Sequence, residues 1–192
     1  MHLFYSSTSP FVRKVLVSAI EIGIDDRIER LACAAHPVNR DMKIVVHNPL
    51  GKIPTLIADD GQAIFDSRVI CEYLHGLVPG SGLFPVDRTQ ALVDQALADG
   101  LLDAALLART EGGLRPEERR WDSWSKVQME KIASALDRFE TEADGFRNRV
   151  DIGTIAVACA ASYLDFRFVN LDWRPSRPAL ASWYATFAQR PS

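Results

Sequence analysis

The pattern of apolar residues changes near residue 77. Before this point, short strand-like runs alternate with segments of helical period, and after it only long amphipathic segments follow. The first part predicts strands at 3–5, 27–31, 55–58 and 63–65, and helices at 10–22, 38–47 and 67–77. A strand–helix–strand unit implies a right-handed crossover with a parallel strand pair, and the closing hairpin adds an antiparallel edge. We therefore expect an α/β domain of order βαβαββα.

A turn-rich stretch separates the two parts of the chain. Residues 78–87 read V-P-G-S-G-L-F-P-V-D, a composition typical of a linker. The amphipathic segments after it lie at 88–109, 116–143, 152–169 and 178–189, and they predict a helical bundle with short connections. The expected organisation is an α/β domain at 1–77, a linker at 78–87 and an all-α domain at 88–192.

Charge, cysteine and histidine usage argue against several classes of function. The net charge is −3 over 192 residues and neither half is basic, so we expect no nucleic-acid partner. The three cysteines are widely spaced and the four histidines show no ligand spacing, so we expect no disulfide framework and no metal. No apolar run approaches the roughly 20 residues that span a membrane, and no secretory signal opens the chain. A cytoplasmic location without membrane contact is the expectation.

A candidate thiol-activating site opens the first predicted helix. The segment T-S-P-F-V-R-K places Thr8 and Ser9 before Pro10, a residue favoured at the first helical position. A helix N-terminus favours a thiolate, and a hydroxyl there can donate a hydrogen bond to sulfur. One charge-assisted bond of about 1.5–3 kcal/mol would lower a thiol pKa by about one to two units. The structural alternative is that Ser9 or Thr8 only caps the helix.

Two further segments predict contacts to an extended, charged ligand. If Pro54 enters its strand through a cis bond, Ile53 can pair its backbone with a peptide ligand, and Lys52 offers a cation for a carboxylate. At the next helix start, Ser67 suits the N-cap and Asp66 can accept a hydrogen bond from an ammonium. The structural alternatives are a plain loop-to-strand transition and simple capping. A thiol, a peptide backbone, a carboxylate and an ammonium together describe glutathione.

These motifs resemble those of the glutathione S-transferase superfamily. The resemblance covers essentially the whole chain and rests on S-P-F-V-R-K at 9–14, N-P-L-G-K-I-P at 48–54 and D-S at 66–67. The chain looks most like bacterial transferase-like proteins with this S-P-F-V-R-K opening. The resemblance implies a thioredoxin-like N-terminal domain followed by an all-helical domain, a cytoplasmic homodimer and a role in detoxification.

The resemblance also implies a role for each matching position. Pro54 corresponds to the family's cis-proline, Ile53 to the residue whose backbone meets the cysteinyl part of glutathione, and Lys52 to a contact with the glycyl carboxylate. Asp66 and Ser67 correspond to the acidic–serine pair that holds the γ-glutamyl end.

Four hydroxyl side chains are candidates for stabilising the glutathione thiolate. Ser9 ranks first because it stands where cysteine-type classes place their cysteine, and Thr8 stands where some serine-type classes place their serine. Ser7 is within reach, and Tyr5 lies in the range used by tyrosine-type classes. With serine at position 9, conjugation, halide displacement, isomerisation and peroxide reduction are possible, whereas thiol transfer through a mixed disulfide is not.

The residues of the helical half indicate fold and function less specifically than the motifs of the first half. Asp151 and Thr154 exchange the residue types of the family's usual capping box but can still form one. Phe11 is a further expected glutathione contact. Candidate walls of a second-substrate pocket beside residues 9–11 are Leu102, Leu106 and Arg109. Aromatic residues expected in the core or at a dimer interface are Trp121, Trp124, Tyr163, Phe166 and Trp173.

The expected function is that of a glutathione transferase-like enzyme that directs the glutathione thiolate at a small hydrophobic electrophile. Glutathione-dependent peroxidase or isomerase side activities would use the same thiolate. The alternative is a non-catalytic glutathione-binding, stress or regulatory protein on the same scaffold.

Overall fold

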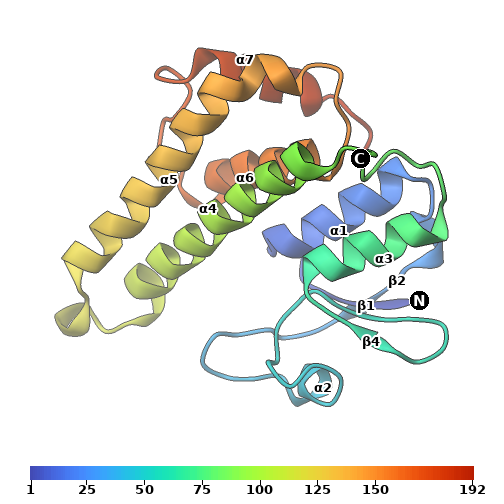
Figure 1. Cartoon of the computed structure of the whole chain (residues 1–192). Coiled ribbons are helices and arrows are strands. Elements are labelled where there is room, and N and C mark those ends of the chain that lie inside the picture. The colour runs from blue at the N-terminus through green and yellow to red at the C-terminus, as the bar shows by residue number, and fades with distance from the viewer. The chain divides into compact units, whose positions relative to one another are not determined.

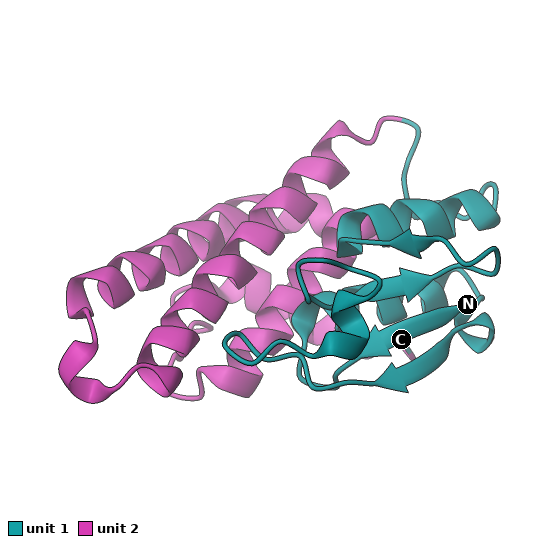
Figure 2. Ribbon diagram, turned by 90° about the horizontal axis from the view of Figure 1, so that it is seen from below, with its two compact units in different colours: residues 1–86, 192 teal, residues 87–191 magenta.

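The structure is a computed structural model that describes residues 1–192. The chain divides into two compact units, residues 1–86 with Ser192, and residues 87–191 (Figure 2). The first unit holds a small mixed sheet with helices, and the second unit holds only helices (Figure 1). The expected fold class is therefore confirmed.

Four strands form the sheet of the first unit, in the order β2-β1-β3-β4. They are β1 (His2–Tyr5), β2 (Glu29–Ala32), β3 (Thr55–Ile57) and β4 (Ala63–Ile64). The first pair, β1 with β2, is parallel, whereas β3 is antiparallel to both β1 and β4. Leu3 lies opposite Leu56 across the β1–β3 pair, and both side chains are fully buried. The predicted parallel pair and antiparallel edge are both present.

Three α-helices accompany this sheet: α1 (Pro10–Glu21), α2 (Met42–Val45) and α3 (Ser67–Leu77). Helices α1 and α3 lie side by side on one face, and α2 lies on the other side of the sheet (Figure 1). Their apolar stripes supply core residues such as Val15 and Ile70, which have no exposed surface.

The helix predicted at 38–47 is wrong in extent. Only the four residues of α2 are helical, because the Asp41 carboxylate caps the helix and accepts the N–H of Lys43 at 3.0 Å. The other Asp41 oxygen accepts the N–H of Ala34 at 2.9 Å, which ties the preceding loop to the helix start. This double use of Asp41 prevents the helix from continuing toward Val38.

Four long helices make the second unit: α4 (Thr89–Leu114), α5 (Asp122–Glu142), α6 (Ile152–Arg167) and α7 (Pro178–Phe187). The predicted segment 116–143 begins instead with a 3₁₀ turn at Glu117–Arg119, so α5 starts later. Helix α6 is buried over nearly all of residues 152–164 and packs against α4. None of these helices combines the length and the apolar character that a membrane span requires.

The start of α6 is held by the expected capping box and by an ion-pair network. Asp151 Oδ1 accepts the N–H of Thr154 at 3.1 Å, and Thr154 Oγ1 accepts the N–H of Asp151 at 3.1 Å. Arg149 donates to Asp151 Oδ2 and to the buried Asp94 of α4, both at 2.9 Å. These bonds join the N-terminus of α6 to α4.

Candidate functional site

The candidate thiol-activating residue Ser9 is the N-cap of α1. Its Oγ accepts the N–H of Val12 at 3.3 Å, and Pro10 occupies the first turn of the helix. No acidic residue stands in that turn, so nothing there opposes the positive end of the helix dipole. A serine hydroxyl that accepts one hydrogen bond keeps its proton for a second partner. Capping and donation to a sulfur are therefore compatible at Ser9.

The other candidate hydroxyls precede Ser9, two of them in the turn between β1 and α1 and the third at the end of β1. Thr8 is exposed and its Oγ1 lies 3.2 Å from Ser6 Oγ, while Ser7 is exposed. Tyr5 ends β1 with its ring 5.9 Å from the Arg30 guanidinium on β2. Helix dipole and N-cap geometry converge at Ser9 alone among the four.

Cys33, just after β2, is a thiol at the same end of the first two strands. Its Sγ donates to the carbonyl oxygen of Tyr5 at 3.3 Å, and burial raises the pKa of the Cys33 thiol. A protonated, hydrogen-bonded thiol is a poor nucleophile. The structure therefore gives Cys33 no part in activating a ligand thiol.

The Ile53–Pro54 peptide bond is cis, as the sequence indicated. No backbone hydrogen bond within the protein engages Ile53, so its N–H and C=O are open to an extended ligand. Pro54 is buried, whereas Lys52 is exposed. This segment therefore presents an unpaired backbone and a cation at the entrance of β3.

Asn48 holds this loop in place, a role that the sequence reasoning missed. The Asn48 side chain is buried and donates to Thr55 Oγ1 at 2.9 Å and to the carbonyl of Lys52 at 3.2 Å. Gly51, inside the loop, has a φ of +64°, a conformation that favours glycine. The N-P-L-G-K-I-P motif could have indicated this role of Asn48. It places a polar residue seven positions before a threonine of the strand, and such a residue can form a hydrogen bond across the turn.

The expected N-cap of α3 is wrong by one residue. Asp66, not Ser67, caps the helix, and its Oδ1 accepts the N–H of Arg68 at 2.9 Å. Ser67 is the first helical residue and is buried, while Asp66 is exposed. A carboxylate at the N-cap accepts orphan N–H groups of the helix and is stabilised by the positive end of the helix dipole.

Strand register brings the three motifs to one edge of the sheet. Phe4, near the end of β1, pairs with Thr55 at the start of β3, and Leu56 pairs with Ile64 at the end of β4. The segments that follow β1 and β4 and the segment that precedes β3 therefore meet at the same edge. Helices α1 and α3 both begin on that side of the unit (Figure 1). This edge combines a helix N-terminus, an open backbone and a carboxylate.

The candidate pocket walls in the second unit all lie on α4. Leu102 is buried, Leu106 half-buried and Arg109 exposed. Burial raises the pKa of Tyr163 on α6, although hydrogen bonds from Arg109 and Arg167 oppose this shift. The Tyr163 hydroxyl is therefore a neutral partner of two guanidinium groups.

The aromatic residues of the second unit divide into two groups. Trp173 and Tyr163 are buried, as expected, whereas Trp121, Trp124 and Phe166 are exposed. The exposed three therefore lie outside the core, and of the two expected locations only a dimer interface is left for them as a prediction. No group of three His, Cys, Asp or Glu side chains could hold a metal ion.

Two family models match the chain, one on each unit. The model for the N-terminal domain of glutathione S-transferases matches residues 8–77, and the model for their C-terminal domain matches residues 90–186. The protein belongs to the glutathione S-transferase family. The resemblance inferred from the sequence motifs is thereby confirmed at the level of the superfamily.

Similar proteins include bacterial members of the family. The uncharacterized GST-like protein YibF of Escherichia coli (strain K12) is 37% identical, and the match covers 100% of this chain and 96% of YibF. A glutathione transferase family member from Pseudomonas fluorescens Pf-5, solved with bound glutathione, is 44% identical with a TM-score of 0.96, over 99% of this chain and 95% of that one. A second structure described in the same terms holds S-(propanoic acid)-glutathione and is 43% identical with a TM-score of 0.91, over 100% and 95% of the two chains.

Proposed function

We propose that this protein is a glutathione transferase that binds glutathione at the sheet edge of the first unit and directs its thiolate at a small hydrophobic electrophile. The observation that carries the proposal is the placement of the Ser9 hydroxyl at the N-terminus of α1, on the edge that also presents the open backbone of Ile53 and the carboxylate of Asp66. Glutathione bound to a relative of TM-score 0.96 supports the same ligand here.

In this proposal, each part of glutathione has its own partner. The γ-glutamyl ammonium binds Asp66, and its carboxylate binds the N–H groups at the start of α3 beside Ser67. The cysteinyl backbone pairs with Ile53 next to Pro54, and the glycyl carboxylate binds Lys52. The ring of Phe11, on the first turn of α1, is the remaining proposed contact to glutathione. The exposure of Lys52 and Asp66 leaves both charged groups accessible to such a ligand.

Ser9 stabilises the thiolate in two ways. Its hydroxyl accepts the N–H of Val12 and donates its proton to the sulfur, and the dipole of α1 favours the negative charge. Against a free thiol pKa of about 8.5, one such bond shifts ionisation toward neutral pH. Thr8 is the alternative donor.

The chemical step forms a sulfur–carbon bond. A lone pair of the thiolate attacks the electrophilic carbon, and either a leaving group departs with its bonding electrons or an activated double bond accepts the pair and then a proton. The thioether S-(propanoic acid)-glutathione bound by the Pseudomonas fluorescens relative is a compound of the kind that such a step produces. Peroxide reduction and isomerisation are side activities that the same thiolate would support. A cytoplasmic homodimer acting in detoxification is part of the proposal.

A non-catalytic glutathione-binding or regulatory protein is the second candidate. The observation that favours it is the hydrogen bond from Val12 to Ser9, because a cap needs no catalytic role to account for the serine. The two candidates differ in whether bound glutathione becomes more acidic.

The deciding experiment is a pH titration of protein-bound glutathione, followed by thiolate absorbance in the ultraviolet. We expect the thiol pKa to lie about one unit or more below that of free glutathione, and we expect Ser9→Ala to abolish much of this lowering. Ser182→Ala, a change at an exposed serine of α7, is the control and leaves the titration unchanged. Binding without a shift supports the non-catalytic candidate. Identical titrations of the wild type and a Thr8→Ala, Ser9→Ala double variant contradict the mechanism.

A further inference from the structure

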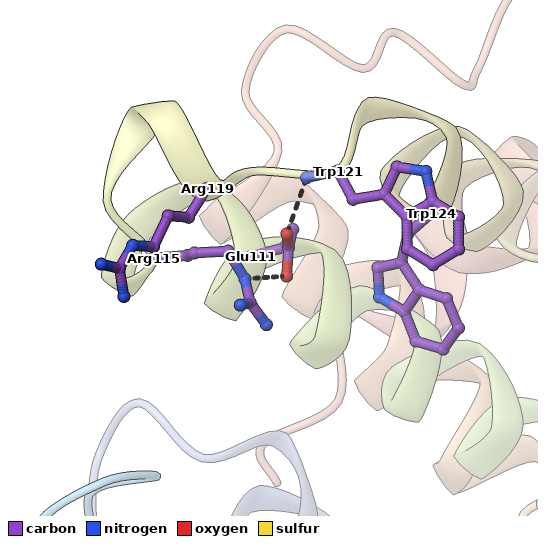
Figure 3. Close-up of a pocket in the computed structure, with 5 residues that line it drawn as sticks. All are labelled: Glu111, Arg115, Arg119, Trp121 and Trp124. Carbon is purple, nitrogen blue, oxygen red and sulfur yellow. Dashed lines mark hydrogen bonds and ion pairs between the residues drawn. The ribbon is translucent and has the colours of Figure 1, made fainter.

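A cavity of about 280 Å³ opens beside the turn between α4 and α5 (Figure 3). Its lining residues are Glu111, Arg115, Arg119, Trp121 and Trp124. All five belong to the second unit, whereas the residues proposed to hold glutathione belong to the first. The lining thus combines two indole rings, two guanidinium groups and one carboxylate.

Glu111 orders one wall of this cavity. It is 7% exposed, and its Oε1 accepts the N–H of Trp121 at 2.9 Å while its Oε2 accepts Arg115 Nε at 2.8 Å. The hydrogen bond from Trp121 and that from Arg115 lower the pKa of Glu111, so the carboxylate stays ionised at neutral pH. The backbone at Trp121 and the guanidinium of Arg115 are thus held in place before any ligand arrives.

The aromatic wall is exposed to solvent. Trp121 is 65% exposed and Trp124 is 39% exposed, and their rings stack with centroids 6.4 Å apart and an interplanar angle of 19°. The other two tryptophans, Trp173 and Trp183, are buried. Indole rings gain much from leaving water, so an exposed stacked pair in a concave site indicates a surface that binds an apolar, planar group.

The opposite wall carries excess positive charge. Glu111 engages Arg115 through Nε only, which leaves the terminal nitrogens of that guanidinium free to donate to an anion. No hydrogen bond or ion pair engages the side chain of Arg119. Figure 3 shows Glu111 between the two arginines on one side and the two tryptophans on the other. With two guanidinium groups against one carboxylate, the lining has a net positive charge.

We propose that this cavity binds a small planar aromatic carboxylate. The aromatic ring of the ligand lies against Trp121 and Trp124, and its carboxylate accepts hydrogen bonds from Arg119 and from the terminal nitrogens of Arg115. A guanidinium fork matches a carboxylate in geometry, which favours this anion over a single-atom ion. The volume of the cavity suits a ligand of one ring rather than a larger polycyclic compound. This assignment rests on residues of the second unit alone.

The test is a tryptophan fluorescence titration of the full chain with 4-nitrobenzoate, a planar carboxylate that quenches indole emission. We expect saturable quenching, and binding of the neutral 4-nitrobenzamide to be weaker by about tenfold or more, the effect of losing a charge-assisted bond. Arg119→Gln is expected to weaken 4-nitrobenzoate binding by a similar factor. Arg147→Gln removes the same charge from an exposed arginine outside the cavity, and it leaves binding unchanged.

Calorimetry of Trp121→Leu supplies a readout that does not depend on emission from the mutated residue. Loss of 4-nitrobenzoate binding heat in this variant supports the proposal, and unchanged binding overturns it. The proposal is also overturned if quenching does not saturate, if the amide binds as tightly as the carboxylate, or if Arg119→Gln and Arg147→Gln behave alike. Shielding of the exposed tryptophans that grows with protein concentration would instead assign the cavity to a second copy of the chain, and it would overturn the small-ligand assignment.

Discussion

The Oγ of Ser9 and the backbone N–H of Val12 form a hydrogen bond of 3.3 Å across the first turn of α1. This bond satisfies one of the orphan N–H groups of the helix and orients the hydroxyl. Because of this bond, most substitutions at Ser9 change both the stability of the helix and the proposed chemistry. Only a side chain that keeps the cap but cannot donate to sulfur distinguishes the two effects.

Ser9→Asp separates capping from thiolate stabilisation. Aspartate caps a helix about as well as serine, so we expect a stability close to that of the wild type, whereas Ser9→Ala loses about 1 kcal/mol. The new carboxylate repels a thiolate and removes the donor, so the pKa of bound glutathione rises in Ser9→Asp. Urea unfolding and the pH dependence of conjugation to a chlorodinitrobenzene measure the two effects. Wild-type conjugation by Ser9→Asp would show that the serine acts only as a cap.

Asp66→Asn tests the proposed ammonium contact in the same manner. Asparagine preserves the cap of α3, so stability changes by only a few tenths of a kcal/mol, while Asp66→Ala loses about 1 kcal/mol. The loss of charge in Asp66→Asn is expected to weaken glutathione binding by about tenfold, measured by calorimetry. Equal affinity in the wild type and Asp66→Asn would limit Asp66 to capping.

Gly153→Ala is expected to destabilise the second unit by about 1–3 kcal/mol, the range for overpacking a core. A Cβ at position 153 would lie 2.7 Å from the carbonyl oxygen of Ala91 and 2.9 Å from Asp94 Cβ, so α4 and α6 must move apart. The control is Gly112→Ala in α4, where nothing lies within 4 Å of the added Cβ. Because alanine favours helix, this control is expected to stabilise by up to about 1 kcal/mol in thermal unfolding. Equal effects of the two variants would contradict the tight α4–α6 contact.

Arg149→Met is expected to cost about 3 kcal/mol or more in chemical unfolding. The substitution leaves Asp94, only 1% exposed, with Gln90 as its remaining partner at 2.8 Å. It also removes a donor from Asp151 at the cap of α6. Adding Asp94→Asn to Arg149→Met should recover part of the loss, because the uncompensated charge is gone. Additive losses in the double variant would show that the pair is not coupled.

The amino terminus of the first unit forms an ion pair whose contribution to stability depends on pH. The ammonium of Met1 donates to Asp59 Oδ1 at 2.7 Å, and this hydrogen bond holds the pKa of Asp59 below its usual value. A lowered pKa in the folded state stabilises the fold above the ordinary aspartate pKa of about 3.9, and this contribution disappears as the pH falls below it. In thermal melts, Asp59→Asn should therefore be less stable than the wild type at neutral pH. The difference should vanish in acid, and a difference independent of pH would contradict the role of this contact.

Local chemistry accounts for what the sequence predicted well. The order of strands and helices follows from apolar periodicity, the cis bond from a proline that enters a strand, and the box of Asp151 and Thr154 from residue types three apart. These features depend on neighbours within one or two turns of chain. The short α2 was missed because its start depends on Asp41 bonding backward to Ala34, a contact with an irregular loop that has no periodic signal.

The order of the elements, and the residue types that can bind a thiol, a peptide backbone and two charged ends, follow from the amino-acid sequence alone. That these segments meet depends on the folded sheet, because the pairing of Phe4 with Thr55 and of Leu56 with Ile64 sets which strand ends share an edge. The folded structure also places Asp66 rather than Ser67 at the cap of α3 and exposes Trp121 and Trp124 to solvent. Strand register and burial depend on contacts between residues far apart in the chain, and apolar spacing within one segment carries no information about them.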